Sequence, residues 1–209
     1  MEYIKYPRTH HLPWSPGATD DDKILMDLSC FNGKRVIVTK KMDGENTTMY
    51  SNHIHARSLD SRGGTDRDWV KTLWAGIAHD IPENWRICGE NLWAKHSIHY
   101  TDLPSYFMGF SVWNEHNTCL GWDDTMQFFE LLGISPVPVM YDFIWDEEKI
   151  KKIHTELLND KDEGFVVRNA DRFHYDQFQH NVVKYVRKGH VQTDTHWRTQ
   201  SFVPNVLIK

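Results

Sequence analysis

The chain has 209 residues, a formal net charge of −5 and 40% hydrophobic residues, and this length normally forms one domain with a sizeable core. Its first residues lack the apolar stretch of a signal peptide, and no later segment is apolar for long enough to span a membrane. The three cysteines lie far apart, without the spacing of a disulfide framework or a thiolate zinc site. These features argue against a secreted or membrane protein and predict a soluble, cytoplasmic or otherwise intracellular monomer.

The charge is unevenly distributed along the chain. Residues 142–162 mix acids and lysines, whereas basic residues outnumber acidic ones in residues 168–209, a stretch that is also rich in aromatic residues and histidine. Such a stretch can contact phosphates and bases, although a solvated charged surface is the simpler explanation.

Six segments have the alternating or β-branched composition of strands and are bounded by Gly, Asn or Pro. They are residues 34–42, 47–57, 85–92, 106–114, 164–170 and 181–187. Because these strands are interrupted by only a few helices, the pattern predicts an α+β fold with mostly antiparallel sheets.

Three segments have the apolar spacing of helices. Residues 65–80 place Trp69, Leu73 and Ile77 on one side, with Thr65 or Asp66 as the expected N-cap. The second helix is expected in residues 123–133, ending at Gly133, and the third in residues 146–160, with Ile150, Ile153 and Leu157 on one side.

The most unusual stretch is KKMDGENTTMY, residues 40–50, where polar residues separate two strand-like segments. Lys-x-Asp-Gly alone is a weak motif, and an Asp-Gly pair most often forms a hairpin turn with exposed lysines. However, further polar residues interrupt the later strand-like segments, and buried charges are costly unless they are partnered. These residues are Arg57, Glu90, Glu163 and Lys184, and the aromatic segment between them offers Phe107 or Phe110 as a stacking surface. Together they form a set that can handle a nucleoside triphosphate.

In order and coverage, these segments resemble the ATP-dependent RNA ligase family of the covalent nucleotidyltransferase superfamily. The successive motifs are KMDGEN, ARS, GENL, FMGFSVW, EGFVVR and VVKYVRK, and the match runs from about Lys41 to Arg187. YPRTHHLPWSPG and HVQTDTHW resemble segments of the small nick-sealing RNA ligases. The resemblance implies a ligase-type nucleotidyltransferase fold, with antiparallel sheets flanked by helices around a nucleotide pocket. It also implies a single catalytic domain over residues 1–209, without the C-terminal OB domain of DNA ligases and capping enzymes.

The resemblance implies catalytic roles for Lys41, Lys184 and Glu163. Lys41 would attack the α-phosphorus of ATP to form lysyl-AMP, and Lys184 would contact the α-phosphate. Asp43 and Glu163 would lie near a Mg²⁺ or Mn²⁺ ion, through its waters.

The nucleotide-binding set implied by the resemblance is larger. Besides Lys41, Glu163 and Lys184, it includes Glu90 on the ribose and Phe110 stacked on adenine. Arg57 would engage the 5′-phosphate of RNA, a task suited to a planar cation. Asn46 completes the set, and because it replaces an arginine typical of DNA ligases, it favours RNA.

Lys41 must be neutral when it attacks. A free lysine has a pKa of about 10.4. Reaction near neutral pH therefore requires the pKa of Lys41 to fall by roughly 3, which costs about 4 kcal/mol. Cationic charge from Lys184, Lys40, Arg57 or a bound metal is expected to lower it. Because neighbours in a strand face opposite sides, only one of Lys40 and Lys41 should enter the pocket, and the motif spacing selects Lys41.

The last motif leaves its second basic residue open between Arg187 and Lys188. His190 and His196 match no closed tetrahedral metal site, which favours polar packing or RNA contact over metal ligation. The predicted activity is joining of RNA 3′-hydroxyl and 5′-phosphate ends at nicks in a duplex. The alternatives are a DNA ligase or capping-type nucleotidyltransferase, and a nonenzymatic RNA-binding module with a degenerate ligase fold.

Overall fold

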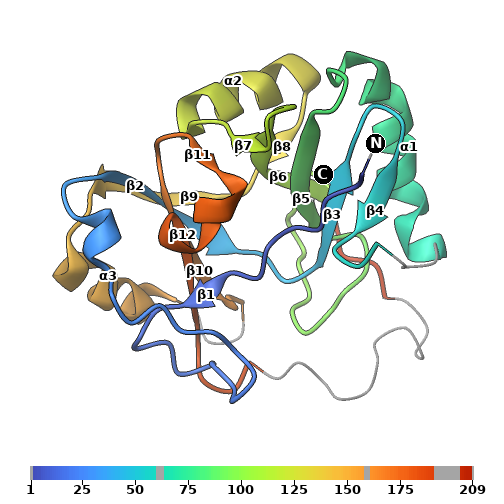
Figure 1. Ribbon diagram of the computed structural model, residues 1–209. Helices are drawn as coiled ribbons and strands as arrows, with labels where there is room; N and C mark the ends of the chain where they lie inside the picture. Colours follow the sequence, from blue (N-terminus) through green and yellow to red (C-terminus); the bar gives the residue numbers. More distant parts are fainter. Residues whose placement is uncertain (1, 60–63, 158–160, 191–202, 209) are drawn as a thin grey trace.

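Two β-sheets lie side by side in the computed structural model, which describes residues 2–59, 64–157, 161–190 and 203–208 (Figure 1). The first sheet has five strands among these residues, and all neighbours are antiparallel except β1 and β12. In spatial order they are β1 (His10–His11), β12 (Val182–Val186), β10 (Gly164–Asn169), β2 (Arg35–Lys41) and β9 (Val139–Ile144).

The second sheet has seven strands within the described residues. Its spatial order is β11 (Phe173–His174), β7 (Thr118–Cys119), β6 (Phe107–Trp113), β5 (Arg86–Asn91), β3 (Glu45–Met49) and β4 (Ile54–Ala56), with β8 (Ser135–Pro136) parallel to β6. The α+β fold with mostly antiparallel sheets is therefore confirmed.

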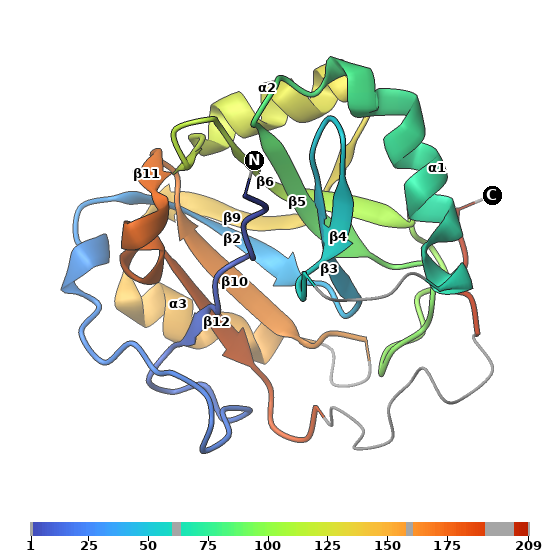
Figure 2. The ribbon, with the colours of Figure 1, turned by 45° about the vertical axis from the view of Figure 1, so that its right-hand side comes forward.

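Helices cover the outer face of each sheet (Figures 1 and 2). Val70 of α1 (Asp68–Ile77) and Phe129 of α2 (Trp122–Leu132) pack in one core with residues of the second sheet. Ile150 and Ile153 of α3 (Glu147–Ile153) pack on the first sheet beside Phe165. Across the described ranges, each helix is too short or too polar to cross a lipid bilayer.

The chain passes from the first sheet to the second between Lys41 and Glu45, so the Asp-Gly pair forms no hairpin. The backbone of Gly44 is not in the left-handed region, and a tight turn does not explain this glycine. Instead, a Cβ atom on Gly44 would lie 2.5 Å from the carbonyl oxygen of Asn91. Glycine is needed here because β5 passes directly beside the crossing.

Several local predictions need correction. The expected strand 47–57 is a hairpin of β3 and β4, and the sequence analysis missed the exposed edge strand β9. The N-cap prediction for the first helix was wrong, because Thr65 and Asp66 lie in a 3₁₀ turn and α1 begins only at Asp68.

The other two helices end differently. Gly133 ends α2 in the left-handed conformation, with φ 66°, as predicted. The third helix stops at Ile153 and continues as a 3₁₀ turn (His154–Glu156), so it is shorter than predicted. Asp146 caps its first turn by accepting a hydrogen bond from the Lys149 N–H at 3.1 Å.

The backbones of β10 and β12 approach each other closely at Gly164. A Cβ atom at this position would lie 1.9 Å from the Tyr185 carbonyl oxygen. We therefore expect Gly164→Ala to separate β10 from β12 and to lower the free energy of unfolding by about 1–3 kcal/mol. Urea unfolding at equilibrium measures this change.

Gly76→Ala is the matched control, because Gly76 lies in α1 with open space around its Cβ position. Gly76→Ala should raise the free energy of unfolding by about 0.5–1 kcal/mol, because alanine is more favourable than glycine inside a helix. Equal unfolding midpoints for the two variants would contradict the close packing at Gly164.

Candidate active site

A cavity of about 210 Å³ opens between the two sheets. Its walls contain every residue assigned to nucleotide binding from the sequence except Glu163, which ion-pairs with Lys41. The residues in the walls are Lys41, Asn46, Arg57, Glu90, Phe110 and Lys184. The fold thus brings together residues that are as much as 143 positions apart, from Lys41 to Lys184 (184 minus 41).

Strand pairing separates the two adjacent lysines. Lys41 pairs with Gly164 and Lys40 with Phe165, and residues paired in this way share a face of the sheet. Phe165 is buried in the core under α3, so the Lys40 side chain lies on that opposite face although the residue also borders the cavity. The Lys40 ammonium ion-pairs with Asp162 at 2.9 Å, whereas that of Lys41 ion-pairs with Glu163 at 2.6 Å.

Carboxylates control the charge of Lys41. Burial disfavours its ammonium form, but Glu163, Glu90 and Asp43 outweigh burial and raise the pKa of Lys41 above its usual value. The expectation that neighbouring cations lower this pKa is therefore wrong for the protein without ligands. The reason is geometric, because the carboxylate of Glu163 is in direct contact with the ammonium.

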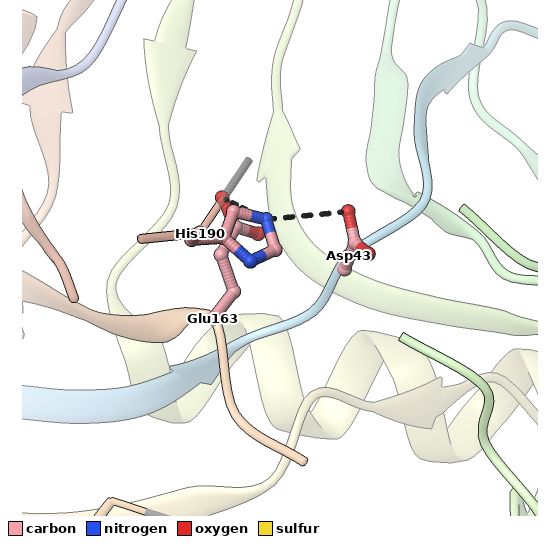
Figure 3. A group of neighbouring side chains, drawn as sticks. All are labelled: Asp43, Glu163 and His190. Carbon is pink, nitrogen blue, oxygen red and sulfur yellow. Dashed lines mark ion pairs between the residues drawn. The ribbon is translucent and has the colours of Figure 1, made fainter. Parts of the chain in front are cut away.

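Asp43, Glu163 and His190 lie close enough to bind one cation. Figure 3 shows the three side chains turned toward one another, and one ligand atom from each lies within 4.8 Å of the others. His190 Nε2 is 3.5 Å from Glu163 Oε1 and 3.8 Å from Asp43 Oδ1. Two carboxylates and one imidazole suit a divalent metal such as Mn²⁺.

The surroundings fix this group. Asp43 Oδ2 accepts hydrogen bonds of 2.8 Å from the backbone N–H groups of Ser97 and Ile98. Burial favours the neutral acid, but His190 and the Ile98 N–H outweigh it and lower the pKa of Asp43. The His190 side chain is only 2% exposed, and its Nδ1 has no hydrogen-bond partner among the described residues. For His190 the sequence predicted polar packing or RNA contact, and no signal in the sequence indicated that Asp43 and Glu163 are its neighbours.

Glu90 and Asn46 face the cavity from paired positions on β5 and β3. Burial raises the pKa of Glu90 to about 8, with Glu163 and Asp43 adding to the rise and Lys41 opposing it. The Asn46 side-chain oxygen is buried and has no hydrogen-bond partner within the described ranges. Both side chains therefore offer polar atoms to a bound molecule.

Of the two aromatic candidates on β6, only Phe110 borders the cavity. Phe107 is fully buried in the core under α1 and α2. The ring of Tyr6 packs edge-on against Phe110, with 5.1 Å between ring centroids. The structure thus distinguishes two phenylalanines that the sequence left as alternatives for stacking.

The N-terminal segment supplies cavity residues that the sequence analysis missed. Ile4 donates its N–H to the Tyr50 hydroxyl beside β3, while β1 pairs with β12 in the first sheet, so the segment connects both sheets (Figure 2). Between these contacts, Tyr6 and Arg8 border the cavity. The only signal in the sequence was the motif YPRTHHLPWSPG, which carried no chemical role.

Residues near the N-terminus also surround Lys184. Asp22 Oδ1 lies 3.8 Å from the Lys184 ammonium, and His11 Nε2 lies 3.5 Å from Asp22 Oδ2. Ser15 Oγ lies 2.8 Å from His11 Nδ1. Burial lowers the pKa of Lys184, and the nearby charges of Lys41 and Arg57 add to this effect while Asp22 and Glu163 oppose it.

The remaining candidates lie elsewhere. Neither Arg187 nor Lys188 lines the cavity, and Arg187 donates a 2.7 Å hydrogen bond to the Asp162 carbonyl oxygen. The question of a second basic residue in this motif therefore stays open. His196 lies outside the described residues.

Several solved structures with similar folds are ligases. An archaeal ATP-dependent RNA ligase has a TM-score of 0.62 at 16% identity, covering 88% of this chain and 48% of the other. A putative ATP-dependent DNA ligase from Aquifex aeolicus has a TM-score of 0.56 at 21% identity, covering 88% and 50%. A mutant RNA ligase from Naegleria gruberi, solved with ATP and Mn, has a TM-score of 0.53 at 16% identity, covering 78% and 52%.

These likenesses show the ligase nucleotidyltransferase fold, and the chain spans about half the length of the structures that it matches. No curated protein matches the chain significantly. The model of the RNA ligase family matches residues 34–186, which include both sheets except β1 and all of the cavity walls except residues 6–9. The chain belongs to the RNA ligase family.

Proposed function

We propose that this protein is an ATP-dependent RNA ligase that joins RNA 3′-hydroxyl and 5′-phosphate ends, most effectively at nicks in a duplex. The observation that carries the proposal is the position of Lys41, whose ammonium ion-pairs with Glu163 at the edge of a cavity that Glu90, Phe110 and Lys184 also line. On this proposal the described residues act as one nucleotidyltransferase domain.

ATP would lie in the cavity between the sheets. Phe110 offers a flat face to the adenine, and Glu90 and Asn46 offer hydrogen-bonding atoms to the nucleoside. The side chain of Lys184 borders the cavity from β12 of the first sheet, and in the cavity it would contact the α-phosphate. The Naegleria ligase with a similar fold was solved with ATP and Mn, which supports this assignment.

Lys41 would act as the nucleophile of the first step. Its neutral amine attacks the α-phosphorus, a P–N bond forms, and the bond to pyrophosphate breaks. The RNA 5′-phosphate then attacks the same phosphorus, which releases Lys41 and gives RNA-adenylate. In the last step the 3′-hydroxyl attacks the 5′-phosphate, and AMP leaves.

Glu163 would determine when Lys41 loses its proton. In the protein without ligands this carboxylate stabilises the ammonium form. Engaging Glu163 elsewhere weakens that ion pair and favours the neutral amine. A Mg²⁺ or Mn²⁺ ion bound by Asp43, Glu163 and His190 would supply positive charge that offsets the phosphate oxygens.

The RNA would approach the cavity beside Arg57. This guanidinium borders the cavity, as does Arg8, and both suit a terminal phosphate. Membership of the RNA ligase family supports RNA as the substrate. The preference for a nick rests on the resemblance of the N-terminal and C-terminal segments to small nick-sealing ligases.

The first prediction concerns the nucleophile. After incubation with ATP and MnCl₂, the protein should gain about 329 Da, the mass of one AMP on lysine, as measured by intact mass spectrometry. Lys41→Ala should show no gain, because its amine is the one on the cavity side of β2.

Lys40→Ala is the matched control, since it removes the neighbouring lysine on the opposite face. It should keep the AMP adduct. An adduct that survives in Lys41→Ala and disappears in Lys40→Ala would refute the assignment. A folded parent that gains no mass with ATP or GTP would instead favour a nonenzymatic RNA-binding module.

The second prediction concerns Glu90. Its carboxyl group in the folded chain keeps a proton up to about pH 8, whereas the unfolded chain loses it near the usual value of 4.5. Between these values the folded state binds more protons, so the free energy of unfolding should decrease as pH rises from about 5 to 8. In Glu90→Gln the free energy of unfolding should decrease less over this pH range, because the variant lacks the titrating carboxyl group.

Urea unfolding at several pH values, without ATP or metal, measures this difference. Glu130→Gln, which changes an exposed glutamate on α2, should keep the slope of the parent. If Glu90→Gln keeps that slope as well, Glu90 does not carry the extra proton.

A further inference from the structure

Residues 203–208 lie against the long β5–β6 loop, residues 92–106, and we call this segment the strap. Isolated bridges join Ala94 to Pro204 and Leu103 to Leu207. Lys95 donates its N–H to the Val203 carbonyl oxygen at 2.7 Å. The strap therefore contacts the loop near both of its ends.

Asn205 makes more hydrogen bonds to the loop than any other residue of the strap. The residue is 1% exposed, and its Nδ2 donates to the Leu92 carbonyl oxygen at 2.8 Å while its Oδ1 accepts from the Tyr100 N–H at 2.8 Å. Its backbone N–H donates to Trp93, and its carbonyl oxygen accepts from the Tyr106 hydroxyl. Asn205 thus contacts the start and the middle of the loop through its side-chain amide and the end of the loop through its backbone.

The same loop holds Asp43. Two of its N–H groups, from Ser97 and Ile98, donate to Asp43 Oδ2, which leaves Oδ1 on the side of His190. In addition, the Asp43 N–H donates to the Tyr100 hydroxyl at 2.9 Å. Tyr100 therefore contacts Asn205 through its backbone and Asp43 through its side chain.

We infer that the strap positions Asp43 for metal binding, and that Asn205 is the positioning residue that acts through Tyr100 and the β5–β6 loop. The inference rests on the metal site of the proposed function. Partners that orient a metal ligand typically contribute about 10- to 100-fold to metal affinity. A loop released from Asn205 no longer holds the Ser97 and Ile98 N–H groups against Asp43.

The test measures Mn²⁺ binding to the full chain without ATP, by the electron paramagnetic resonance signal of free Mn²⁺. Asn205→Ala should weaken binding by about 10- to 100-fold. In the adenylation assay the Mn²⁺ concentration for half-maximal rate should rise by a similar factor. At saturating Mn²⁺ the KM for ATP should stay unchanged, because no ATP contact is assigned to the strap.

Asn169→Ala is the matched control. Asn169 is also a buried asparagine, 2% exposed, and its side chain bonds to Asn181 and to the Asp171 N–H rather than to the loop. This variant should lose stability and keep the Mn²⁺ affinity of the parent. An equal loss of affinity in both variants would overturn the inference, because general destabilisation would then explain it.

Tyr100→Phe tests the same inference at a second residue. It removes only the acceptor of the Asp43 N–H, and it should weaken Mn²⁺ binding even where Asn205→Ala does not fold. In the double variant the two losses should be less than additive, because both changes act on one connection. Unchanged affinity in Tyr100→Phe would overturn the route through this residue.

The parent separates the two proposals. If the parent binds no Mn²⁺, or if Asp43→Asn binds Mn²⁺ as tightly as the parent, the metal site of the proposed function fails. If the parent binds Mn²⁺ there and folded Asn205→Ala binds it equally well, the strap has no positioning role and the metal site stands.

Discussion

The crossing of the chain between the two sheets is the constraint on which the site depends. β2 ends at Lys41 in one sheet, and β3 begins at Glu45 in the other. Lys41 and Asp43 therefore lie at the junction, where side chains from both sheets can reach them. Gly44 permits the crossing, because any larger residue would collide with the backbone of β5. The polar stretch in the sequence marks this change of sheet.

Electrostatic balance at the junction follows from the same geometry. Glu163 is in direct contact with the Lys41 ammonium and is the main group that raises the pKa of Lys41, and it also lies beside His190. One carboxylate is thus shared between the proposed nucleophile and the proposed metal group. A protein that must hold lysine charged at rest and release its proton with substrate bound can use such sharing.

Pattern and pairing predicted much of this arrangement. The alternation rule placed Lys41 and Lys40 on opposite faces, and the α+β class followed from strand composition. The motifs named most of the cavity walls. The predicted N-cap of α1 was wrong because a 3₁₀ turn precedes the helix. Phe107 and Phe110 could not be distinguished as stacking residues without the register of β6. Tyr6 and His190 lie in segments that resembled the family, but no pattern in the sequence placed them beside the cavity or the carboxylates.

The N-terminal segment has a mechanical consequence. It is attached to the second sheet through Ile4 and to the first through β1, and Tyr6 packs on Phe110 between these attachments. A hinge motion that moved the sheets apart would stretch this segment and would have to break at least one of the two attachments. The segment thus works as a tie that opposes separation of the two walls of the cavity.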